Sequence, residues 1–397
     1  MKRKFQLLIK HILDVLFSPL LIMGALIARI IPKKNIVRAL IGLSPNNNLI
    51  YLRDSLNKIG YNSQVIPWII PNHEKENIDY NLNINDFFPR LYSNFFGQLL
   101  LIYCFFLWSL FNFDLYIMPF QNRLLDRTGF LKWFEFQLLF LARKKIILNP
   151  YGGDIQFPEV WQASSDKAFK QLHKAWMEDG YYSKTNSEKT KKNNKYCTKW
   201  ANALIISLEW PDYLEKGHYN YFHMRCVPSA KAPSEVSVNN KIFTILHATN
   251  HGHFKGTQYL EEAVASINKN QKICNLIILK NTPNQEVLEL IKEADVVFDQ
   301  ILLGAYGRLA IEAMSLGKPV LCYLREDLKE FYPNWAECPI VNANIDNIKE
   351  KIIELMKMSQ EERNAIGKQS LNYVNKYHSS EYVGDKLHQI IQKVLNS

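Results

Sequence analysis

The segment NHGHFKGT, from Asn250 to Thr257, has the composition of a phosphate-binding loop. An apolar run precedes it and an amphipathic helix pattern follows it, so Lys255 lies just before a predicted helix N-terminus. There the ammonium group adds to the helix dipole in binding a diphosphate. Gly256 allows the backbone to approach a ligand closely, and Thr257 suits the N-cap position. The loop residues expected to bind phosphate are Asn250, His251, Lys255, Gly256 and Thr257.

A second stretch, Ala294 to Tyr323, has the order strand, polar loop, glycine turn, helix, strand. Gly307 would leave the N–H groups of the following helix free at the carboxyl edge of a sheet, where open α/β folds bind phosphorylated ligands. Arg308 adds positive charge at the start of that helix. Glu312 is a carboxylate that could accept hydrogen bonds from sugar hydroxyls, and the alternative for it is an ordinary solvated helix residue.

Several metal and nucleotide motifs are missing from the sequence. There is no G-x-x-x-x-G-K-[ST] loop, and no G-x-G-x-x-G segment supports a dinucleotide oxidoreductase. His251 and His253 lack an H-E-x-x-H or cysteine partner, which favours phosphate contacts over metal binding. No D-x-D pair could clamp a metal on a diphosphate. We therefore predict no metal and no cofactor, with Lys255, Arg308 and the amides after Gly307 neutralising the diphosphate.

The first half of the chain has a glycine turn with an acid, PYGGD, from Pro150 to Asp154. Asparagine, glycine and aspartate are the usual turn residues, so an ordinary turn is the simplest interpretation. The turn follows a predicted strand from Lys145 to Asn149, however. The alternation of strands and helices therefore places Asp154 at the carboxyl edge of the first sheet.

Both halves of the chain alternate short apolar strands with helices, which predicts an α/β protein with two similar domains facing a central cleft. The length of 397 residues also favours more than one domain, because single cores stop growing at about 250 to 300 residues. The segment from Pro228 to Asn240 is polar and aperiodic and is the predicted linker. The predicted boundaries are 1–34 for an N-terminal helix, 35–228 and 229–379 for the two domains, and 380–397 for a C-terminal helix.

Two apolar segments raise the question of a membrane. Val15 to Ala28 is shorter than the roughly 20 residues of a membrane span, so this helix is expected either to pack on the first domain or to lie in a membrane surface, and the sequence favours neither. Phe95 to Phe113 is followed directly by strands of the same predicted sheet. We expect a buried or interfacial helix there.

The formal net charge of +10 suits nucleic acid, an anionic membrane or a phosphorylated substrate. The lysine-rich run from Lys184 to Lys199 could bind nucleic acid or form a solvated loop. We predict a solvated loop and no nucleic-acid partner, because no aromatic interleaving or recognition-helix pattern accompanies the run. The six cysteines are scattered and none forms a C-x-x-C pair, which is typical of free thiols in a reducing compartment.

Two quoted segments resemble the GT-B glycosyltransferases of the group 1 (family 4) type. HATNHGHFKGT is similar to that family's strand-loop-helix ending in K-G-T, and ADVVFDQILLGAYGRLAIEAMSLGKPVLCY is similar to a bacterial branch with D-Q, Y-G, I-E-A-M and G-K-P-V. The resemblance covers His247 to His378. In the first half, Tyr151 to Asp154 is similar to the acceptor-side G-S-D segment.

This resemblance implies two Rossmann-like domains, with a nucleotide sugar bound mainly by the second one. It implies that Lys255 binds the diphosphate and Glu312 the ribose hydroxyls, and that the last helix crosses back to the first domain. The predicted catalytic residues are Asp154, Lys255 and Glu312. The predicted substrate-binding residues are Tyr151, Gly152, Gly153, Asn250, His251, Gly256, Thr257, Asp299, Gln300, Tyr306, Gly307, Arg308 and Leu309.

The sequence departs from the family's E-x7-E pair, because Gly304 stands eight residues before Glu312. The arginine that usually partners the loop lysine in this family is also not evident between Asn250 and His253, and we hypothesise that Arg308 or a histidine compensates. The prediction is a metal-independent glycosyltransferase of the hexosyltransferase type. It would move a sugar from a nucleotide-diphosphate donor to a glycan or lipid-linked acceptor in surface polysaccharide or lipopolysaccharide biosynthesis. The expected location is cytoplasmic, with peripheral contact at the inner face of an anionic membrane.

Two other functions fit the same residues. One is a nucleotide-sugar-binding scaffold that has lost catalysis, which the glycine at position 304 supports. The other is a nucleotide-sugar epimerase on the same fold, which would convert free donor without an acceptor and would not need a lipid-facing half.

Overall fold

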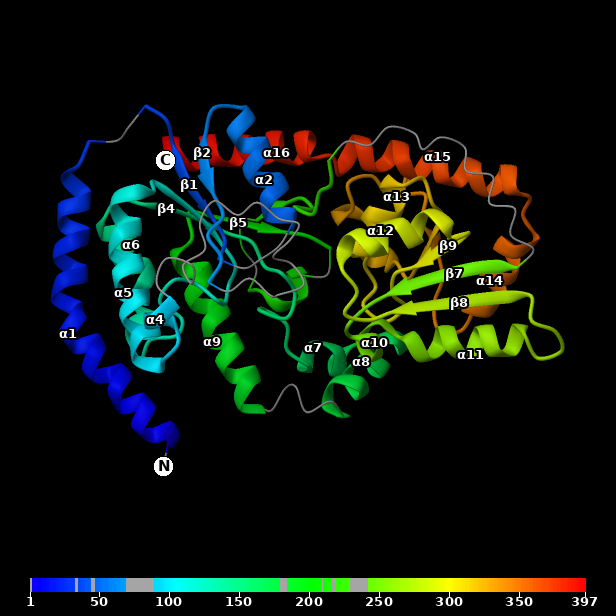
Figure 1. The fold of residues 1–397 in the computed structure, drawn as a ribbon, viewed down its shortest axis with the longest axis horizontal. Helices are drawn as coiled ribbons and strands as arrows, with labels where there is room; N and C mark the ends of the chain where they lie inside the picture. Colours follow the sequence, from blue (N-terminus) through cyan, green and yellow to red (C-terminus); the bar gives the residue numbers. More distant parts are fainter. Residues whose placement is uncertain are drawn as a thin grey trace.

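The computed structural model of the chain describes residues 2–32, 35–43, 47–68, 89–178, 184–208, 210–215, 217, 219–228 and 242–397. Within them the chain forms two parallel sheets, one in each half, with helices packed around both (Figure 1). The predicted linker after Pro228 lies almost wholly outside the described residues.

The first sheet has the strand order β2-β1-β3-β4-β5-β6. Strand β2 pairs on one side of β1, and the chain then crosses over so that β3 pairs on the other side. The strand order therefore reverses between β1 and β3. Every described pairing in it is parallel, which puts the carboxyl ends of β3 and β4 at one edge. Its strands are β1 (Arg38–Ile41), β2 (Asn62–Gln64), β3 (Leu115–Met118), β4 (Lys145–Leu148), β5 (Ala203–Ile206) and β6 (Asn220–Tyr221).

The helices of the first half alternate with these strands. Described as α-helices are α1 (Lys2–Ile30), α2 (Asn47–Lys58), α4 (Pro89–Tyr92), α5 (Phe95–Asn112), α6 (Glu135–Leu141), α7 (Glu159–Ala163), α8 (Lys167–Glu178) and α9 (Lys184–Trp200). The short 3-10 helices are η2 (Leu131–Trp133) and η3 (Trp210–Tyr213).

The second sheet has the order β11-β10-β9-β7-β8, again with parallel pairings. Its order reverses between β7 and β9, the kind of position at which open α/β sheets bind ligands. The strands are β7 (Phe243–Ala248), β8 (Cys274–Leu279), β9 (Val296–Phe298), β10 (Val320–Cys322) and β11 (Val341–Asn342). The helices are α10 (Gly252–Lys255), α11 (Thr257–Ile267), α12 (Asn284–Glu293), α13 (Arg308–Ser315), η4 (Glu326–Phe331), α14 (Ile348–Lys357), α15 (Gln360–Tyr377) and α16 (Ser380–Asn396).

The last helix, α16, returns to the first half and packs on α2 (Figure 1). Gly384 permits this close contact, because a Cβ there would lie 2.0 Å from Ser55 Oγ. Ser55 in turn donates a hydrogen bond of 2.6 Å to the carbonyl of Ser380. Just before α16, buried His378 is bonded at Nε2 to the Tyr306 hydroxyl at 2.8 Å, and its Nδ1 lies 3.1 Å from the Arg225 carbonyl of the first half. These contacts join the second half of the chain to the first.

The first helix, α1, lies along α5 and α6 with one face buried and the other exposed (Figure 1). The buried face carries Asp14, whose carboxylate accepts hydrogen bonds from the Tyr103 hydroxyl at 2.6 Å and the Leu131 N–H at 3.1 Å. By length and composition, α1 and α5 are both apolar enough to cross a membrane, with 33% and 44% of the relevant windows buried. The buried face shows that α1 packs on the first domain.

The prediction of a solvated loop from Lys184 to Lys199 is wrong, because the segment is the helix α9. Its inner face is made of small and polar side chains, which an apolar periodicity cannot reveal. Asn193 donates to the Phe120 carbonyl at 2.8 Å and Asn194 to the Ile155 carbonyl at 3.0 Å, while Cys197 is fully buried. These hydrogen bonds add to the apolar contacts of Tyr196 and Trp200 in holding the helix against the first domain.

Candidate active site

Two loops meet where the second sheet reverses its strand order. Lys255 follows β7 and Asp299 follows β9, and their side chains form an ion pair with Nζ 2.9 Å from Oδ1. Asp299 is fully buried, whereas about a quarter of the Lys255 side chain (23%) is exposed. The lysine therefore reaches the surface from a fixed anchor, at the position the fold uses for ligands.

The Lys255 loop is tighter than the sequence indicated, because residues 252–255 form the extra helical turn α10. Gly256 ends this turn in the left-handed conformation with φ of +78°. A Cβ at that position would lie 2.5 Å from Ile301 Cγ2. Only glycine meets both requirements without strain. The tight turn fixes the Lys255 backbone, whose carbonyl also accepts a 2.9 Å hydrogen bond from the Ile301 N–H.

Asp299 also orients the start of α13. Its second carboxylate oxygen accepts a hydrogen bond from the N–H of Gly307, the residue that precedes the helix. No side chain caps the first turn of α13 itself. The N–H groups of Arg308 and Leu309 consequently point out of the helix N-terminus beside Lys255, in the arrangement that binds phosphate oxygens in many proteins.

A buried histidine supports the same loop from below. His247 Nδ1 lies 2.9 Å from the Phe298 carbonyl and Nε2 lies 2.9 Å from the Thr257 hydroxyl. Burial lowers the pKa of His247 to about 4, so the ring is neutral near pH 7. Nδ1 then donates to the carbonyl and Nε2 accepts from Thr257. Thr257 thus joins the loop to the core instead of facing a ligand.

Glu312 lies on the buried side of α13 and is only 6% exposed. Its Oε1 atom accepts hydrogen bonds from Arg308 Nε at 2.7 Å and from Asn284 Nδ2 at 3.1 Å. The interpretation of Glu312 as a solvated helix residue is therefore wrong. Burial raises the pKa of Tyr51, on α2 of the first half, and the charges of Arg308 and Glu312 also act on that pKa. Neither Asn284 nor Tyr51 carried a sequence signal that pointed to this site.

The other predicted donor-side residues occupy different settings. Gln300 is fully buried and shapes the following turn, with Oε1 accepting from the Leu303 N–H at 2.7 Å. Tyr306 is also fully buried, so only its backbone could touch a ligand. Leu309 packs in the core of the second half. Asn250 Oδ1 accepts from the Asn281 N–H at 2.7 Å, and His251 is exposed at the start of α10.

Gly304, which replaces an acid of the family pattern, has φ of +75°. A Cβ at this position would lie 2.5 Å from Cγ and Cδ of Arg325, so the arginine fills the space that a side chain would need. Arg325 pairs with Asp327 at 2.5 Å and, across to the first half, with Asp212 at 2.8 Å. Sequence reasoning missed Arg325, although it follows β10 at the carboxyl edge of the sheet.

The acceptor-side turn is organised around Asp154. Its Oδ1 atom accepts hydrogen bonds from the N–H groups of Tyr151 at 2.8 Å and Gly152 at 3.0 Å, and its Oδ2 atom accepts from Phe120 at 3.0 Å. Gly152 has φ of +121° and Gly153 is exposed. Burial raises the pKa of Asp154 to about 6, against the opposing effect of these N–H groups. Asp154 thereby joins the loops that follow β3 and β4.

In the part of the chain that the structure describes, no group of three His, Cys, Asp or Glu side chains could hold a metal ion. The structure thus brings Lys255, Asp299, Gly307, Arg308 and Glu312 into one cluster of cations, carboxylates and helix N–H groups. The Asp154 turn forms a second cluster in the other half.

Residues 252–372 match the family model of glycosyl transferases group 1. This range covers less than half of the chain and contains the cluster around Lys255. No curated protein sequence matches the chain.

Solved structures resemble the whole chain. A sucrose-phosphate synthase from Thermosynechococcus elongatus has a TM-score of 0.55 at 12% identity, covering 91% of this chain and 100% of its own. The Anabaena protein HepE in complex with UDP-glucose has a TM-score of 0.54 at 13% identity, covering 90% of this chain and 99% of its own. The comparisons confirm the predicted GT-B fold with two Rossmann-like domains, and with the matched family they support a glycosyltransferase enzyme.

Proposed function

We propose that the chain is a metal-independent glycosyltransferase that moves a sugar from a nucleotide-diphosphate donor to a glycan or lipid-linked acceptor in surface polysaccharide biosynthesis. The observation that carries this proposal is the convergence of Lys255 and the uncapped start of α13 on Asp299. A lysine beside a helix N-terminus is suited to a diphosphate, and it lies at the reversal point of the second sheet.

In this proposal the two groups act on the leaving nucleotide diphosphate. Negative charge builds up on that group as the bond to the sugar breaks, and Lys255 and the α13 N–H groups stabilise it. Lys255 shifts from Asp299 towards the phosphate, while Asp299 keeps the Gly307 N–H in place. Glu312, already an acceptor for Arg308 and Asn284, accepts hydrogen bonds from the ribose hydroxyls.

Asp154 has a different role in the proposal. Both of its carboxylate oxygens are engaged by backbone N–H groups. It therefore fixes the shape of the glycine turn, and the exposed Gly153 leaves room for an acceptor beside that turn. The chemistry of the acceptor is then set by the first half of the chain.

We also infer peripheral binding to an anionic membrane through the outer face of α1, on the cytoplasmic side. Its exposed side chains are large and apolar, such as Phe5 at 63%, Leu16 at 62% and Met23 at 53%. Exposed basic residues lie near both ends of the helix, including Lys4 and Arg29. An apolar face flanked by cations is the arrangement of interfacial helices.

The direct test is turnover of a panel of nucleotide sugars by the purified protein, with and without EDTA. We expect release of nucleoside diphosphate that EDTA does not reduce and that Lys255→Ala abolishes. Full turnover by Lys255→Ala would refute the role of the lysine, and loss of activity in EDTA would refute metal independence.

A second candidate is a nucleotide-sugar-binding scaffold without catalysis. The observation that favours it is Gly304, where Arg325 occupies the space of the acid in the family pattern. Binding of a nucleotide sugar with neither transfer nor hydrolysis would support the scaffold over the enzyme.

A further inference from the structure

A small basic pocket lies between the loop that follows β3 and the helix α9. Its volume is about 160 Å³, room for roughly five water molecules and hence for a phosphate group. Three of its cations, Arg127, Lys132 and Lys189, form no ion pair with any residue that the structure describes. The residues that line it are Gln121, Asn122, Arg123, Asp126, Arg127, Lys132, Trp133, Lys189 and Asn193.

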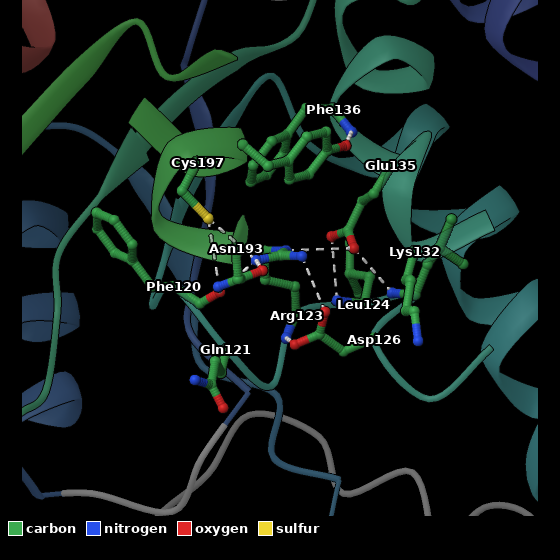
Figure 2. Close-up of polar contacts among 12 residues, drawn as sticks. Phe120, Gln121, Arg123, Leu124, Asp126, Lys132, Glu135, Phe136, Asn193 and Cys197 are labelled. Carbon is green, nitrogen blue, oxygen red and sulfur yellow. Dashed lines mark hydrogen bonds and ion pairs between the residues drawn. The ribbon is translucent and has the colours of Figure 1, made fainter. Parts of the chain in front are cut away.

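The wall of the pocket is held by a buried arginine (Figure 2). The Arg123 guanidinium lies 2.9 Å from Asp126 and 3.7 Å from Glu135, and Asn193 Oδ1 accepts from it at 3.1 Å. Glu135 also accepts hydrogen bonds of 3.1 and 3.0 Å from the two N–H groups that follow Arg123. Asp126, the acid of the pocket lining, is therefore paired with Arg123, which it shares with Glu135, and the three outer cations are not needed for this pairing.

Further cations gather beside the pocket. Lys132 and Lys192 lie 5.8 and 4.9 Å from the centre of the Trp133 ring. Burial lowers the pKa of Lys10, and the positive charges of Lys132, Arg127 and Lys189 lower it further. Asp14 is an acid that lies close to Lys10, and its carboxylate already accepts hydrogen bonds from Tyr103 and Leu131. The balance of charge around the pocket is positive, which favours an anion.

An apolar groove runs along the outer face of α1. It has a volume of about 500 Å³ and is lined by Val15, Ser18, Pro19, Ile22, Met23 and Leu26 of α1 and by Phe130. Phe130 directly precedes η2, the turn that carries Lys132. A hydrocarbon chain in the groove and an anionic group in the pocket would therefore be neighbours.

The pocket also adjoins the predicted acceptor-side turn. The Phe120 N–H donates to Asp154 Oδ2 at 3.0 Å, and Gln121 Nε2 donates to the Asp154 carbonyl at 2.7 Å. The loop that lines the pocket is therefore bonded to the turn at the same edge of the first sheet.

We propose that the pocket binds the phosphate of an amphiphilic acceptor, a hydrocarbon-linked phosphate or diphosphate whose chain lies in the groove along α1. The sugar beyond the phosphate would extend to the turn at Asp154. This inference rests on the proposed function and narrows its acceptor to the lipid-linked class. Each unpaired cation would contribute a charge-assisted hydrogen bond to a phosphate oxygen.

The other end of α1 provides a matched control. A cavity of about 480 Å³ there is lined by Arg29, Arg38, Asp114, Arg143 and Lys144, among others. Arg38 begins β1, while Asp114 and Lys144 immediately precede β3 and β4. This basic cavity therefore lies at the amino edge of the sheet, away from Asp154. Loss of a charge there would weaken membrane attraction equally but would not touch the acceptor phosphate.

The test measures binding of farnesyl diphosphate, farnesol and inorganic diphosphate to the full chain by calorimetry. We expect farnesyl diphosphate to bind at least about tenfold more tightly than either of the others. Lys189→Ala should lose this advantage, about tenfold, while Arg29→Ala, which removes the same single charge, keeps it and Lys189→Arg retains most of it. Thermal unfolding of each variant verifies folding.

Three results would overturn the proposal. Equal affinity for farnesol would show an apolar site only, and equal affinity for inorganic diphosphate would show a free-anion site. An equal loss in Arg29→Ala would show general attraction of anions to a basic protein. Binding of a nucleoside diphosphate is measured on the same variants. If that binding persists while one of these three results is found, the proposed acceptor site is refuted and the proposed donor site is not.

Discussion

The two halves of the chain differ in whether the cations of their candidate sites form ion pairs. In the second half, the cations of the candidate site already have carboxylate partners, with Lys255 on Asp299 at 2.9 Å and Arg308 on Glu312 at 2.7 Å. In the first half, Arg127, Lys132 and Lys189 line a pocket without ion-pair partners among the described residues. The outer face of α1 likewise exposes large apolar side chains.

This difference indicates how each half meets its ligand. Ion pairs hold the side chains of the second half in a fixed geometry before a small ligand arrives. Unpaired cations are solvated by water and stay available to an anion, and an exposed apolar face is stabilised when an apolar partner covers it. This difference supports the proposal that the donor binds to the second half and an anionic, amphiphilic partner to the first.

The largest effect expected from breaking the donor side is that of Lys255→Ala. Removing one preorganised cation from a developing charge should lower turnover by about 100- to 1,000-fold. The measurement is nucleoside diphosphate release at saturating donor. Lys272→Ala, an exposed lysine of the same domain, is the control and should retain full turnover. Equal losses in both variants would show a general charge effect instead of a site.

The junction between the halves should be sensitive to acid. Burial lowers the pKa of His378 from 6.5 to about 4, so the unfolded chain binds this proton at higher pH than the folded chain does. Neutral His378 therefore contributes to the free energy of unfolding above pH 6.5. This contribution, up to about 3 kcal/mol, is lost as the pH falls towards 4.

Urea unfolding at several pH values measures this slope. His378→Gln should flatten it, while His247, buried with a pKa of about 4 in the second half, maintains a similar contribution of its own. An unchanged slope in His378→Gln would show that the histidine at the junction titrates normally.

Gly304→Ala tests whether Arg325 holds its place beside the donor cluster. The substitution requires a left-handed backbone and a contact at 2.5 Å with Arg325, and should lower the free energy of unfolding by about 1 to 3 kcal/mol. Gly60 has φ of +99° with no atom within 4 Å of a Cβ, so Gly60→Ala measures the backbone cost alone. Gly304→Ala should destabilise the protein more than Gly60→Ala does, and this extra loss of stability should vanish when Arg325 is also replaced by alanine. If the extra loss persists in the Arg325→Ala background, a clash with Arg325 is excluded as its cause.

The smallest of these effects is expected for Glu312→Gln. The amide keeps the shape but weakens acceptance from Arg308 and from ribose hydroxyls, so donor affinity should fall about tenfold with little change in turnover at saturation. Calorimetry with nucleoside diphosphate measures it. Glu289→Gln, on an exposed residue of α12 paired with Lys292, is the control, and an equal effect there would remove Glu312 from the site.

Much of the fold could be predicted because short apolar runs and glycine turns mark the strands and helices of both sheets. The helix α11 that follows Gly256 is predicted from such local signals, whereas the turn α10 before it is not. The helix α9 could not be recognised, because most of its buried side chains are polar and several are held by hydrogen bonds, so an apolar periodicity is missing; they include Thr190, Asn193 and Asn194.

The site was predictable only in part, for a related reason. Lys255 and Glu312 lie within motifs, so the sequence alone points to them. The bridging role of Asp299 and the position of Arg325 against Gly304 depend on contacts between segments far apart in the chain. Such contacts leave no local pattern, and Tyr51 on α2 is a third example.

The central claim is that Lys255 and the start of α13 bind the diphosphate of the donor. Its most direct test compares the affinity of the wild-type chain for a nucleoside diphosphate and for the matching nucleoside monophosphate. We predict at least about tenfold tighter binding of the diphosphate, and loss of that difference in Lys255→Ala. Equal affinities in the wild-type chain, or a difference that survives Lys255→Ala, would contradict the account.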